Sequence, residues 1–526
     1  MKDIRLWGIL VLALAVRAVM LFAVFADVER AETPDSRDYG KLAFYMSEQG
    51  EFLHKIIFLD IGGVLDKSPE VFRTPGYPAL LAAADRAADT ATSENNYFKR
   101  ITRSIAVRTA PLDLKIILSF QVLLDLHLVL LTFLLGRSLA GRGAGLLAAL
   151  LQAVSPLAAA ASCRILTDGI FAFLLTAAVL LLIRHFRMGG WWSLLSAAAV
   201  MGASCYIRPV GMAFSAVMAL VVLCSRRGPK FFPEGVTLTR PSGPPSPVKG
   251  EGLQGDAETI TVRPRRLLRT AGFACIVLLC IAPWVARNVT VADYWGFSSF
   301  ATDSMYWYSA AEIEARRMDW GVETVRKEFR RAEGWPGNSS SMSLPAGKRA
   351  CDLSPGGLAR YRFAKAREII LAHPWDFADI HMRGNVAFWL PGAPDALEVL
   401  GYTSGNKGTL DVLHREGLVA AAKHYFGDNT AAMALAGGMV VIFLIRCVGV
   451  VLCGLWRLRP RRMTSAGWLC LLLVVAAFGL PGPANHPRFR VPVEPILSAA
   501  AAIGYLSVIE FHRRVRRDRR EERERS

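Results

Sequence analysis

The sequence has few of the features that stabilise soluble enzymes or small secreted domains. Of its nine cysteines, only Cys351 lies in a polar region, and the other eight lie in or beside apolar segments. No disulfide framework is therefore predicted. The sequence also lacks a Walker loop, a dinucleotide-binding fingerprint, a cluster of zinc ligands and internal repeats. These absences leave out the common nucleotide-binding, zinc-dependent and disulfide-stabilised classes.

What the chain does have is apolar length. Of its 526 residues, 53% are hydrophobic, which is typical of a polytopic membrane protein with an all-α fold. The first apolar segment exceeds the length of a signal peptide, contains Arg17 and lacks a clear cleavage site, so we expect it to be retained. About ten transmembrane helices are predicted, at 5–26, 114–136, 143–163, 166–185, 191–207, 209–225, 268–286, 431–456, 464–481 and 491–511.

The formal net charge of +18 does not indicate binding to nucleic acid. Lys and Arg gather in the N-terminal flank, in alternate loops between the spans and in the tail 512–526. This distribution is typical of cytoplasmic loops and predicts that both termini are cytoplasmic. We therefore expect a multi-pass protein of the inner (plasma) membrane, with segments 27–113 and 288–430 on the external side.

These segments predict a domain organisation. The first external loop should contain two interfacial helices, at 37–48 and 79–90. The insert at 226–266 is rich in Pro, Gly and Ser and cannot bury a core, so we expect a disordered cytoplasmic linker. The predicted units are a transmembrane core (1–287), a mostly helical external or periplasmic domain (288–430), C-terminal transmembrane helices (431–511) and a basic cytoplasmic tail (512–526).

Asp35 and Asp38 follow the first span and lie three residues apart, so on a helix they share a face. A carboxylate there can accept a proton from a hydroxyl or hold a metal ion. The alternative is structural, because an acid at a helix N-terminus caps the helix or complements its dipole.

Arg73 begins a turn that two prolines rigidify and that contains Tyr77. Its guanidinium group either binds a phosphate or extends to the lipid headgroups. Near the last span, His486, Arg488 and Arg490 lie on the external side, where the positive-inside rule disfavours arginine. They fit a lipid-linked phosphate, and the alternative is again contact with headgroups.

Other external junctions also carry charge: Asp168, Arg208 and Arg287 each lie near the external end of a span. Their convergence indicates an anionic ligand at the outer surface. Within the membrane, Arg17 and Asp125 each lie near the middle of a span. A lone charge at that depth is costly, so we predict an ion pair between them, which His127 and Gln121 could join.

In this order, the motifs resemble those of the multi-span GT-C glycosyltransferases. They comprise Asp35-Ser-x-x-Tyr39, Arg73-x-Pro-Gly-Tyr-Pro, Arg-Pro at 208–209, Pro-Trp-x-x-Arg-Asn at 283–288 and Arg488-Phe-x-x-Pro. Similar branches are the dolichyl-phosphate-mannose protein mannosyltransferases, the aminoarabinose transferases of lipid A and the glycosyltransferases of the lipopolysaccharide core. The resemblance implies a GT-C-like fold and sugar transfer from a polyprenyl phosphate on the external face.

The resemblance also implies roles for individual residues. Asp35 matches the acid that serves as general base, Asp38 falls at a variable position beside it, and Arg488 matches the arginine that engages the donor phosphate. Arg73 stands where some members have an acidic metal ligand, so no metal or other cofactor is expected to be required. The remaining predicted contacts are Arg73, Arg208, His486 and Arg490 to the donor phosphate, and Tyr39, Tyr77, Asp168 and Arg287 to substrate.

External space lacks nucleotide sugars, so the predicted partners are a polyprenyl-phosphate sugar donor, a glycan, glycolipid or protein acceptor, and membrane lipids. The leaving phosphate gains charge in the transition state, and arginines would stabilise it. Two alternatives remain open at this point. An O-antigen polymerase or ligase would place its key residues in later loops, and a lipid or polysaccharide transporter would place charges deep in several spans.

Overall fold

The computed structural model describes residues 4–57, 64–89, 112–225, 264–334, 353–402, 412, 416–457 and 463–525. Helices dominate these residues, which confirms the predicted all-α class. A two-stranded antiparallel sheet, β1 (Leu53–Ile57) with β2 (Val64–Pro69), interrupts the first external loop. The sheet was not predicted, because short strands with polar residues carry little periodic signal.

Among the described residues, six helices are long and apolar enough to cross a membrane. Each was predicted as a span. They carry apolar residues that are buried against neighbouring helices and others that are exposed, as a helix between protein and lipid requires. They are α1 (Ile4–Ala26), α5 (Leu112–Ala140), α8 (Asp168–Met188), α11 (Pro264–Ala292), α20 (Thr430–Arg457) and α22 (Glu494–Arg525).

The remaining predicted spans are broken or short. Helices α6 (Arg142–Ala153) and α7 (Pro156–Ser162) bend by 61° at a break, where Ser155 caps the second helix and Pro156 opens it. Helices α9 (Trp191–Ile207), α10 (Gly211–Cys224) and α21 (Ser465–Gly479) have fewer than 18 residues. All ten predicted spans are thus helical, but length and composition support six or seven crossings, and the count of ten is not confirmed.

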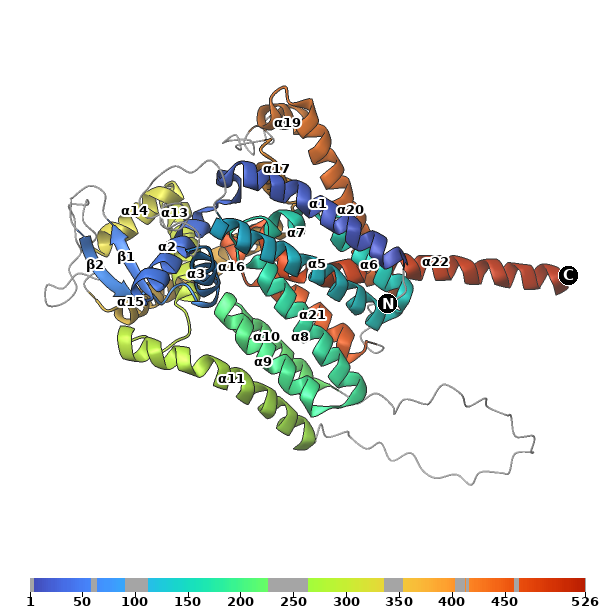
Figure 1. The fold of residues 1–526 in the computed structure, drawn as a ribbon, viewed down its shortest axis with the longest axis horizontal. Coiled ribbons are helices and arrows are strands. Elements are labelled where there is room, and N and C mark those ends of the chain that lie inside the picture. Colours follow the sequence, from blue (N-terminus) through green and yellow to red (C-terminus); the bar gives the residue numbers. More distant parts are fainter. Residues whose placement is uncertain are drawn as a thin grey trace.

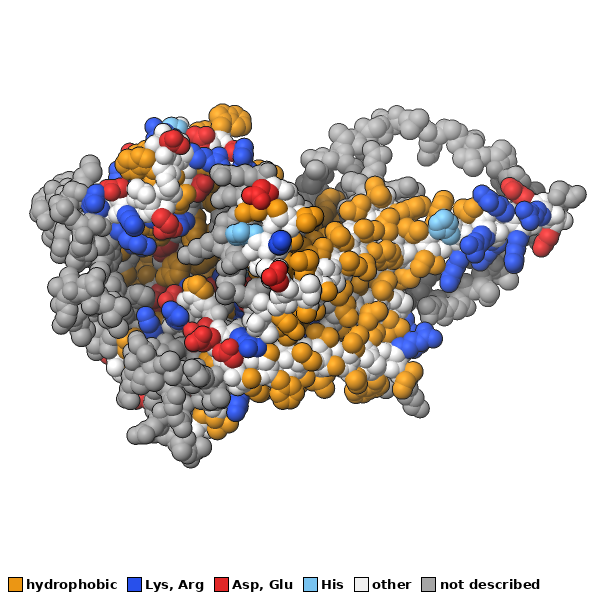
Figure 2. Space-filling model, turned by 90° about the horizontal axis from the view of Figure 1, so that it is seen from above, with side chains coloured by type: hydrophobic (Ala, Val, Ile, Leu, Met, Phe, Trp, Pro, Cys, Tyr) orange, Lys and Arg blue, Asp and Glu red, His pale blue; other side chains and the backbone are white. Residues whose placement is uncertain are grey.

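The bundle has two polar ends. In Figure 1 the N-terminus and the C-terminal part of α22 lie toward one end of the bundle, whereas the sheet, α2 (Pro34–Gln49) and α3 (Gly76–Asp89) lie toward the other. Between the ends, hydrophobic side chains cover the visible face of the bundle, and charged side chains gather beyond it (Figure 2). This apolar belt is what a multi-pass membrane protein presents to lipid.

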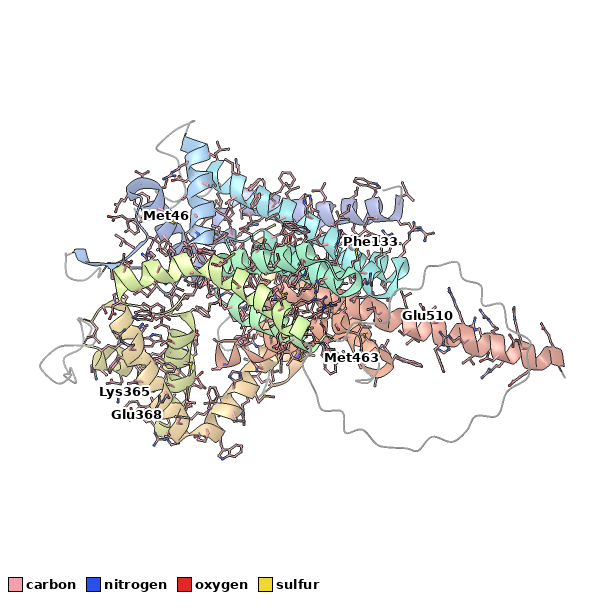
Figure 3. The ribbon with its side chains drawn as sticks, turned by 90° about the horizontal axis from the view of Figure 1, so that it is seen from below. Met46, Phe133, Lys365, Glu368, Met463 and Glu510 are labelled. Atoms are coloured by element: carbon pink, nitrogen blue, oxygen red, sulfur yellow. The ribbon has the colours of Figure 1, made fainter. Side chains whose placement is uncertain are left out.

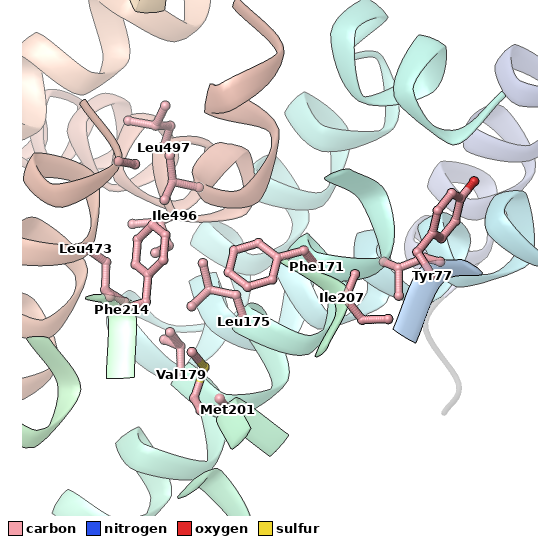
Figure 4. Packing of buried hydrophobic residues seen from close by; sticks show 14 of the residues in the cluster. Tyr77, Phe171, Leu175, Val179, Met201, Ile207, Phe214, Leu473, Ile496 and Leu497 are labelled. Atoms are coloured by element: carbon pink, nitrogen blue, oxygen red, sulfur yellow. The ribbon is translucent and has the colours of Figure 1, made fainter. Parts of the chain in front are cut away.

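Buried side chains from several helices form one core. Phe171 and Leu175 of α8, Phe214 of α10 and Leu497 of α22 belong to this core, and Figure 4 shows them packed together. Small residues bring other helices close: a Cβ atom added at Gly504 would lie 2.0 Å from a backbone oxygen of α20. Close backbone approach at glycine is common in membrane bundles.

The segments that were predicted to be external are largely helical. Helices α2 and α3 correspond to the two helices expected in the first loop, and Lys365 and Glu368 of α15 lie at the end of the molecule away from Glu510 of α22 (Figure 3). The further helical elements are η1 (Val28–Ala31), α12 (Phe300–Ser304), η2 (Met305–Ala310), α13 (Ala311–Met318), α14 (Val322–Ala332), α15 (Pro355–Ala372), α16 (Pro374–Asn385), η4 (Val386–Trp389), α17 (Ala393–Leu400), α19 (Leu418–Phe426), η6 (Gly482–Ala484) and η7 (Pro487–Val493).

The predicted boundaries fit these elements only in part. Helix α11 continues to Ala292, past the predicted end of the core, and α22 continues into the predicted tail at 512–526 as a helix. Most of the predicted insert at 226–266 lies outside the described residues, except that α11 begins at Pro264. The division into domains therefore stays a prediction.

The predicted ion pair between Arg17 and Asp125 is confirmed. Arg17 Nε lies 2.7 Å from Asp125 Oδ2, and both side chains are buried. Arg17 also donates to the backbone oxygens of Gln152 and Ala153 at the end of α6. His127 and Gln121 do not join the pair, because His127 bonds the Leu123 carbonyl and Gln121 bonds Tyr77 and two backbone oxygens.

We expect Asp125→Leu to lower the free energy of unfolding by about 3–5 kcal/mol, because it leaves Arg17 as an unpaired charge in the bundle. The double variant Arg17→Met with Asp125→Leu should recover much of this loss. Expression level and thermal unfolding in detergent check both. If Asp125→Asn and Asp125→Leu both leave these quantities unchanged, the pair does not stabilise the protein.

Candidate functional site

The first helix of the external loop presents Asp35. Thr33 is the N-cap of α2, and it exchanges bonds with Ser36 in a capping box, while Pro34 takes the first helical position. The capping role considered for Asp35 therefore belongs to Thr33, and Asp35 is an acid of the first turn. Ser36 Oγ also donates to the Ile165 carbonyl at 2.9 Å, which fixes this end of α2 against the segment before α8.

Arg73 joins the two acids of α2. Its Nη2 atom lies 2.7 Å from Asp35 Oδ1 and 3.0 Å from Asp38 Oδ2, so the acids share a face as predicted. Its Nη1 donates to the Tyr39 hydroxyl at 3.3 Å. The Glu70 carboxylate accepts a 2.9 Å bond from the Arg73 backbone N–H and so positions the turn.

Arg488 reaches the same carboxylate from the other end of the chain. Its Nη2 atom bonds the second oxygen of Asp35, across a sequence separation of 453 residues. Burial alone would raise the pKa of Asp35, but the Arg73 and Arg488 guanidinium groups outweigh it and hold this pKa well below its ordinary value. In the structure Asp35 is therefore ionised, with each of its oxygens bonded to an arginine.

A second ion pair lies beside the first. Asp168, in the first turn of α8, bonds Arg208, which ends α9. The Phe489 ring lies 5.3 Å from the Cζ atom of Arg208 and 5.3 Å from that of Arg488, and so links the two pairs. Asp168 also acts electrostatically on Arg488. We name this set the arginine–carboxylate cluster: Asp35, Asp38, Asp168, Arg73, Arg208 and Arg488.

The two tyrosines line this cluster in different ways. The Arg73 Cζ atom lies 4.9 Å from the centre of the Tyr39 ring, and that ring meets Tyr77 edge to face at 5.0 Å. Tyr77 is buried, and its hydroxyl donates to Gln121 at 2.7 Å. Tyr39 thus contacts the cluster directly, whereas Tyr77 supports it from behind.

Two predicted ligands lie away from the cluster. Arg490 is buried and bonds Glu494 and two backbone oxygens, so its donors do not face the cluster. Arg287 donates to the carbonyl oxygens of Glu70 and Phe52 and ties α11 to the first loop. These guanidinium groups already satisfy internal acceptors, and their predicted roles in phosphate and substrate binding stay predictions.

His486 adjoins the cluster as the N-cap of η7. Its Nδ1 atom accepts a bond from the Arg488 backbone N–H at 3.3 Å. Burial lowers the pKa of His486, and the charges of Asp395, Arg488, Asp168 and Arg164 act on it as well. A neutral ring can accept the capping bond, and a protonated ring cannot.

This arrangement predicts a pH dependence. Because the folded-state pKa of His486 lies below its unfolded value, the related stability is present above the ordinary histidine range and is lost as the pH falls through that range. His486→Asn keeps an acceptor at the cap but does not titrate. We expect it to flatten the acid side of the profiles of melting temperature and donor affinity. An identical acid limb in this variant would assign the titration to another group.

Several contacts of the site were not predicted. Phe489 lies between Arg488 and Arg490 in the sequence. Its aromatic ring was the feature of the sequence that could have indicated a contact with an arginine. Arg164 bonds Asp395 at 2.8 Å and also bonds Glu398, which holds α17 beside the segment that leads into α8. Contacts over such sequence separations cannot be read from spacing.

A divalent metal does not fit the described donor set well. Each carboxylate of the arginine–carboxylate cluster already accepts from a guanidinium group. A cation would need two or more of these oxygens and would lie next to the arginine charges. The chemistry of the cluster favours an anion instead, because guanidinium groups bind phosphate oxygens in pairs.

One protein family matches part of the chain. The family of dolichyl-phosphate-mannose-protein mannosyltransferases matches residues 111–234. The matched family consists of glycosyltransferases, the class that the sequence motifs resemble. It covers α5 to α10, which carry Asp168 and Arg208. Among curated proteins, none matches the chain significantly.

Several solved structures resemble this chain at low sequence identity. The oligosaccharyltransferase of Archaeoglobus fulgidus in its apo form has a TM-score of 0.46 and 13% identity, over 95% of this chain and 50% of its own. A structure of the same enzyme, AglB, with an inhibitory peptide and a dolichol-phosphate gives 0.46 and 13%, over 99% and 52%. ArnT from Cupriavidus metallidurans bound to undecaprenyl phosphate gives 0.38 and 12%, over 95% and 78%. This chain thus spans about half the length of the archaeal enzyme.

Proposed function

We propose that this glycosyltransferase moves a sugar from a polyprenyl-phosphate donor to an acceptor hydroxyl on the external face of the inner (plasma) membrane. The proposal includes inversion at the anomeric carbon and both termini in the cytoplasm. One observation carries it: Arg73 and Arg488, from opposite ends of the chain, meet on Asp35. This places two groups that can bind a phosphate next to a carboxylate that can accept a proton.

The reaction uses these groups directly. Asp35 takes the proton of the acceptor hydroxyl as its oxygen forms a bond to the anomeric carbon. The bond from that carbon to the phosphate oxygen breaks, and its electron pair leaves with the polyprenyl phosphate. Arg488 stabilises the charge that grows on this phosphate, and each such donor is worth about 3–4 kcal/mol in the transition state.

Binding of the donor also activates the base. In the structure Arg488 Nη2 bonds Asp35, and a bound phosphate would compete with this carboxylate for the guanidinium group. A bound phosphate would draw Arg488 from Asp35 and raise the low pKa of this acid toward its ordinary range. Asp35 would keep its bond to Arg73, which holds it against the acceptor.

The neighbouring residues fit this scheme in supporting roles. Arg208 lies on the far side of Phe489 and offers a second guanidinium group to the phosphate. Tyr39 and Asp38 both contact Arg73; Tyr39 is buried, whereas Asp38 is more exposed and could meet an acceptor or the sugar. These contacts fit a glycan, a glycolipid or a protein as the acceptor equally well.

The two alternatives have less support. A polymerase or ligase would concentrate its chemistry in later loops, yet Asp35 and Arg73 belong to the first. A transporter would carry charges deep in several spans, and the bundle does hold a second buried pair, Arg446 with Glu494, which was not predicted. Like Arg17 with Asp125, that pair is bonded internally, and the family match favours the enzyme.

Transfer of radiolabelled sugar from polyprenyl phosphate, measured in membranes with and without the chain, tests the proposal. We expect label to move to an acceptor only when both the chain and the lipid-linked donor are present. Transfer from a nucleotide sugar alone, or lipid movement across the bilayer without transfer, would contradict it.

A further inference from the structure

The guanidinium group of Arg490 is buried, and its bonds go to residues outside the cluster. Its Nε lies 2.7 Å from Glu494 Oε1, and its Nη1 donates to the carbonyl oxygens of Phe388 at 2.5 Å and Leu390 at 2.8 Å. The Phe443 ring lies 4.6 Å from its Cζ atom. Arg490 therefore fastens η7 to η4, α20 and α22 at once.

Glu494 connects these elements together with Arg490. It is the first residue of α22 and is fully buried. Besides Arg490, its carboxylate bonds Arg446 of α20 and accepts a 2.9 Å bond from Ser155, the N-cap of α7. One carboxylate thus connects the broken span, α20 and the start of the last span.

Arg490 and Arg488 both belong to η7, so holding Arg490 in place also restricts the position of Arg488. A 3-10 helix has about three residues per turn, so side chains two positions apart leave it in different directions. Arg488 points to the cluster with 22% of its side chain exposed, and Arg490 points inward with 1%. Pro487 and Pro492 restrict the backbone on both sides of these arginines.

The charges of Arg446, Arg490 and Glu494 do not balance, which argues against a purely stabilising role for these residues. Two buried arginines share one buried carboxylate, which leaves a positive excess in the bundle, and Arg446 Nε has no bonded partner. Replacing such groups by apolar residues is often neutral for stability, and their best-supported use is to impose one arrangement. The pair of Arg17 with Asp125 is balanced one to one and bonds α5 and α6, not η7.

We propose that Arg490 and Glu494 form a buried clamp that positions Arg488 for the donor phosphate. Glu494 and Arg490 are then positioning residues, and they touch neither donor nor acceptor. This inference rests on the proposed function for the identity of the ligand. The clamp itself is a statement about Arg488 and can be measured without the ligand.

The test compares Glu494→Gln with Asp125→Asn, since each removes the charge of one buried carboxylate bonded to arginine. The first readout is the rate at which phenylglyoxal modifies Arg488, followed by mass spectrometry on the purified chain without lipid donor. The second is the affinity for undecaprenyl phosphate, and the third is the melting temperature. We expect both variants to lower the melting temperature by similar amounts.

Only Glu494→Gln should expose Arg488 to several-fold faster modification and weaken binding of undecaprenyl phosphate by about tenfold or more. Glu494→Asp keeps the charge but shortens the side chain; it should show the same changes in weaker form, and it replaces Glu494→Gln if that variant does not fold. A folded variant with unchanged Arg488 reactivity overturns the clamp. Faster modification in Glu494→Gln, with no binding of undecaprenyl phosphate by the unaltered chain, supports the clamp and overturns the proposed function.

Discussion

Asp35→Asn should abolish sugar transfer while the protein stays folded. The amide has nearly the same shape as the acid and does not disturb the cap that Thr33 provides, but it cannot take a proton from the acceptor. Loss of a positioned general base costs about a hundredfold or more in rate. Initial rates with purified protein and a lipid-linked donor measure the effect, and the melting temperature shows that the fold is intact.

The same variant has a second signature. Because Asp35 and the donor phosphate compete for Arg488, Asp35→Asn should bind undecaprenyl phosphate at least as tightly as the unaltered chain. Asp38→Asn is the matched control: Asp38 is more exposed and bonds only Arg73 within the cluster, so its rate should fall several-fold at most. Near-normal transfer by Asp35→Asn would remove this residue from the mechanism.

Arg488→Ala should make the chain nearly inactive with its lipid-linked donor. Removing the side chain has two effects. The phosphate loses a contact in the ground state, and the leaving group loses stabilisation in the transition state. The second effect alone lowers the rate by about 10²–10³-fold. Arg488→Lys should recover only part of the lost activity, because an ammonium group cannot form the paired bonds of a guanidinium group. Steady-state kinetics with varied donor separate the two contributions.

Arg316→Ala gives the matched control for Arg488. Arg316 lies on α13 among the external helices and pairs with Asp379, and neither residue contacts the cluster. Its removal takes away one external arginine but should leave kcat/KM for the donor unchanged. Equal losses in both variants would point to general electrostatics. Unchanged kinetics in Arg488→Ala would exclude Arg488 as a ligand of the donor.

The fold was predicted where hydrophobicity alone decides it. All ten apolar segments are helical, because an apolar run has no other way to satisfy its backbone in lipid. Their number as crossings was overestimated. The bend between α6 and α7 depends on Ser155 and Pro156 and on arginines from other helices, and no window of sequence contains those contacts. The hairpin of the first loop was missed for a similar reason.

The candidate site was predicted in outline. The shared external side of Asp35, Arg73 and Arg488 led to the expectation of one anionic site, and the structure brings the three together. Arg490 was assigned to the same site because sequence spacing does not show which way a 3-10 helix points each side chain. The bonds of Arg287 could not be predicted, because its acceptors are backbone oxygens, which carry no sequence signal.

The central claim is that Asp35 and Arg488 act together on a lipid-linked sugar. The most direct test is transfer from polyprenyl-phosphate sugars, extracted from membranes and radiolabelled, by the purified chain in lipid vesicles. We expect transfer with inversion by the unaltered chain, and no transfer by Asp35→Asn, which should still bind undecaprenyl phosphate. Transfer by Asp35→Asn at a rate close to that of the unaltered chain would contradict the claim.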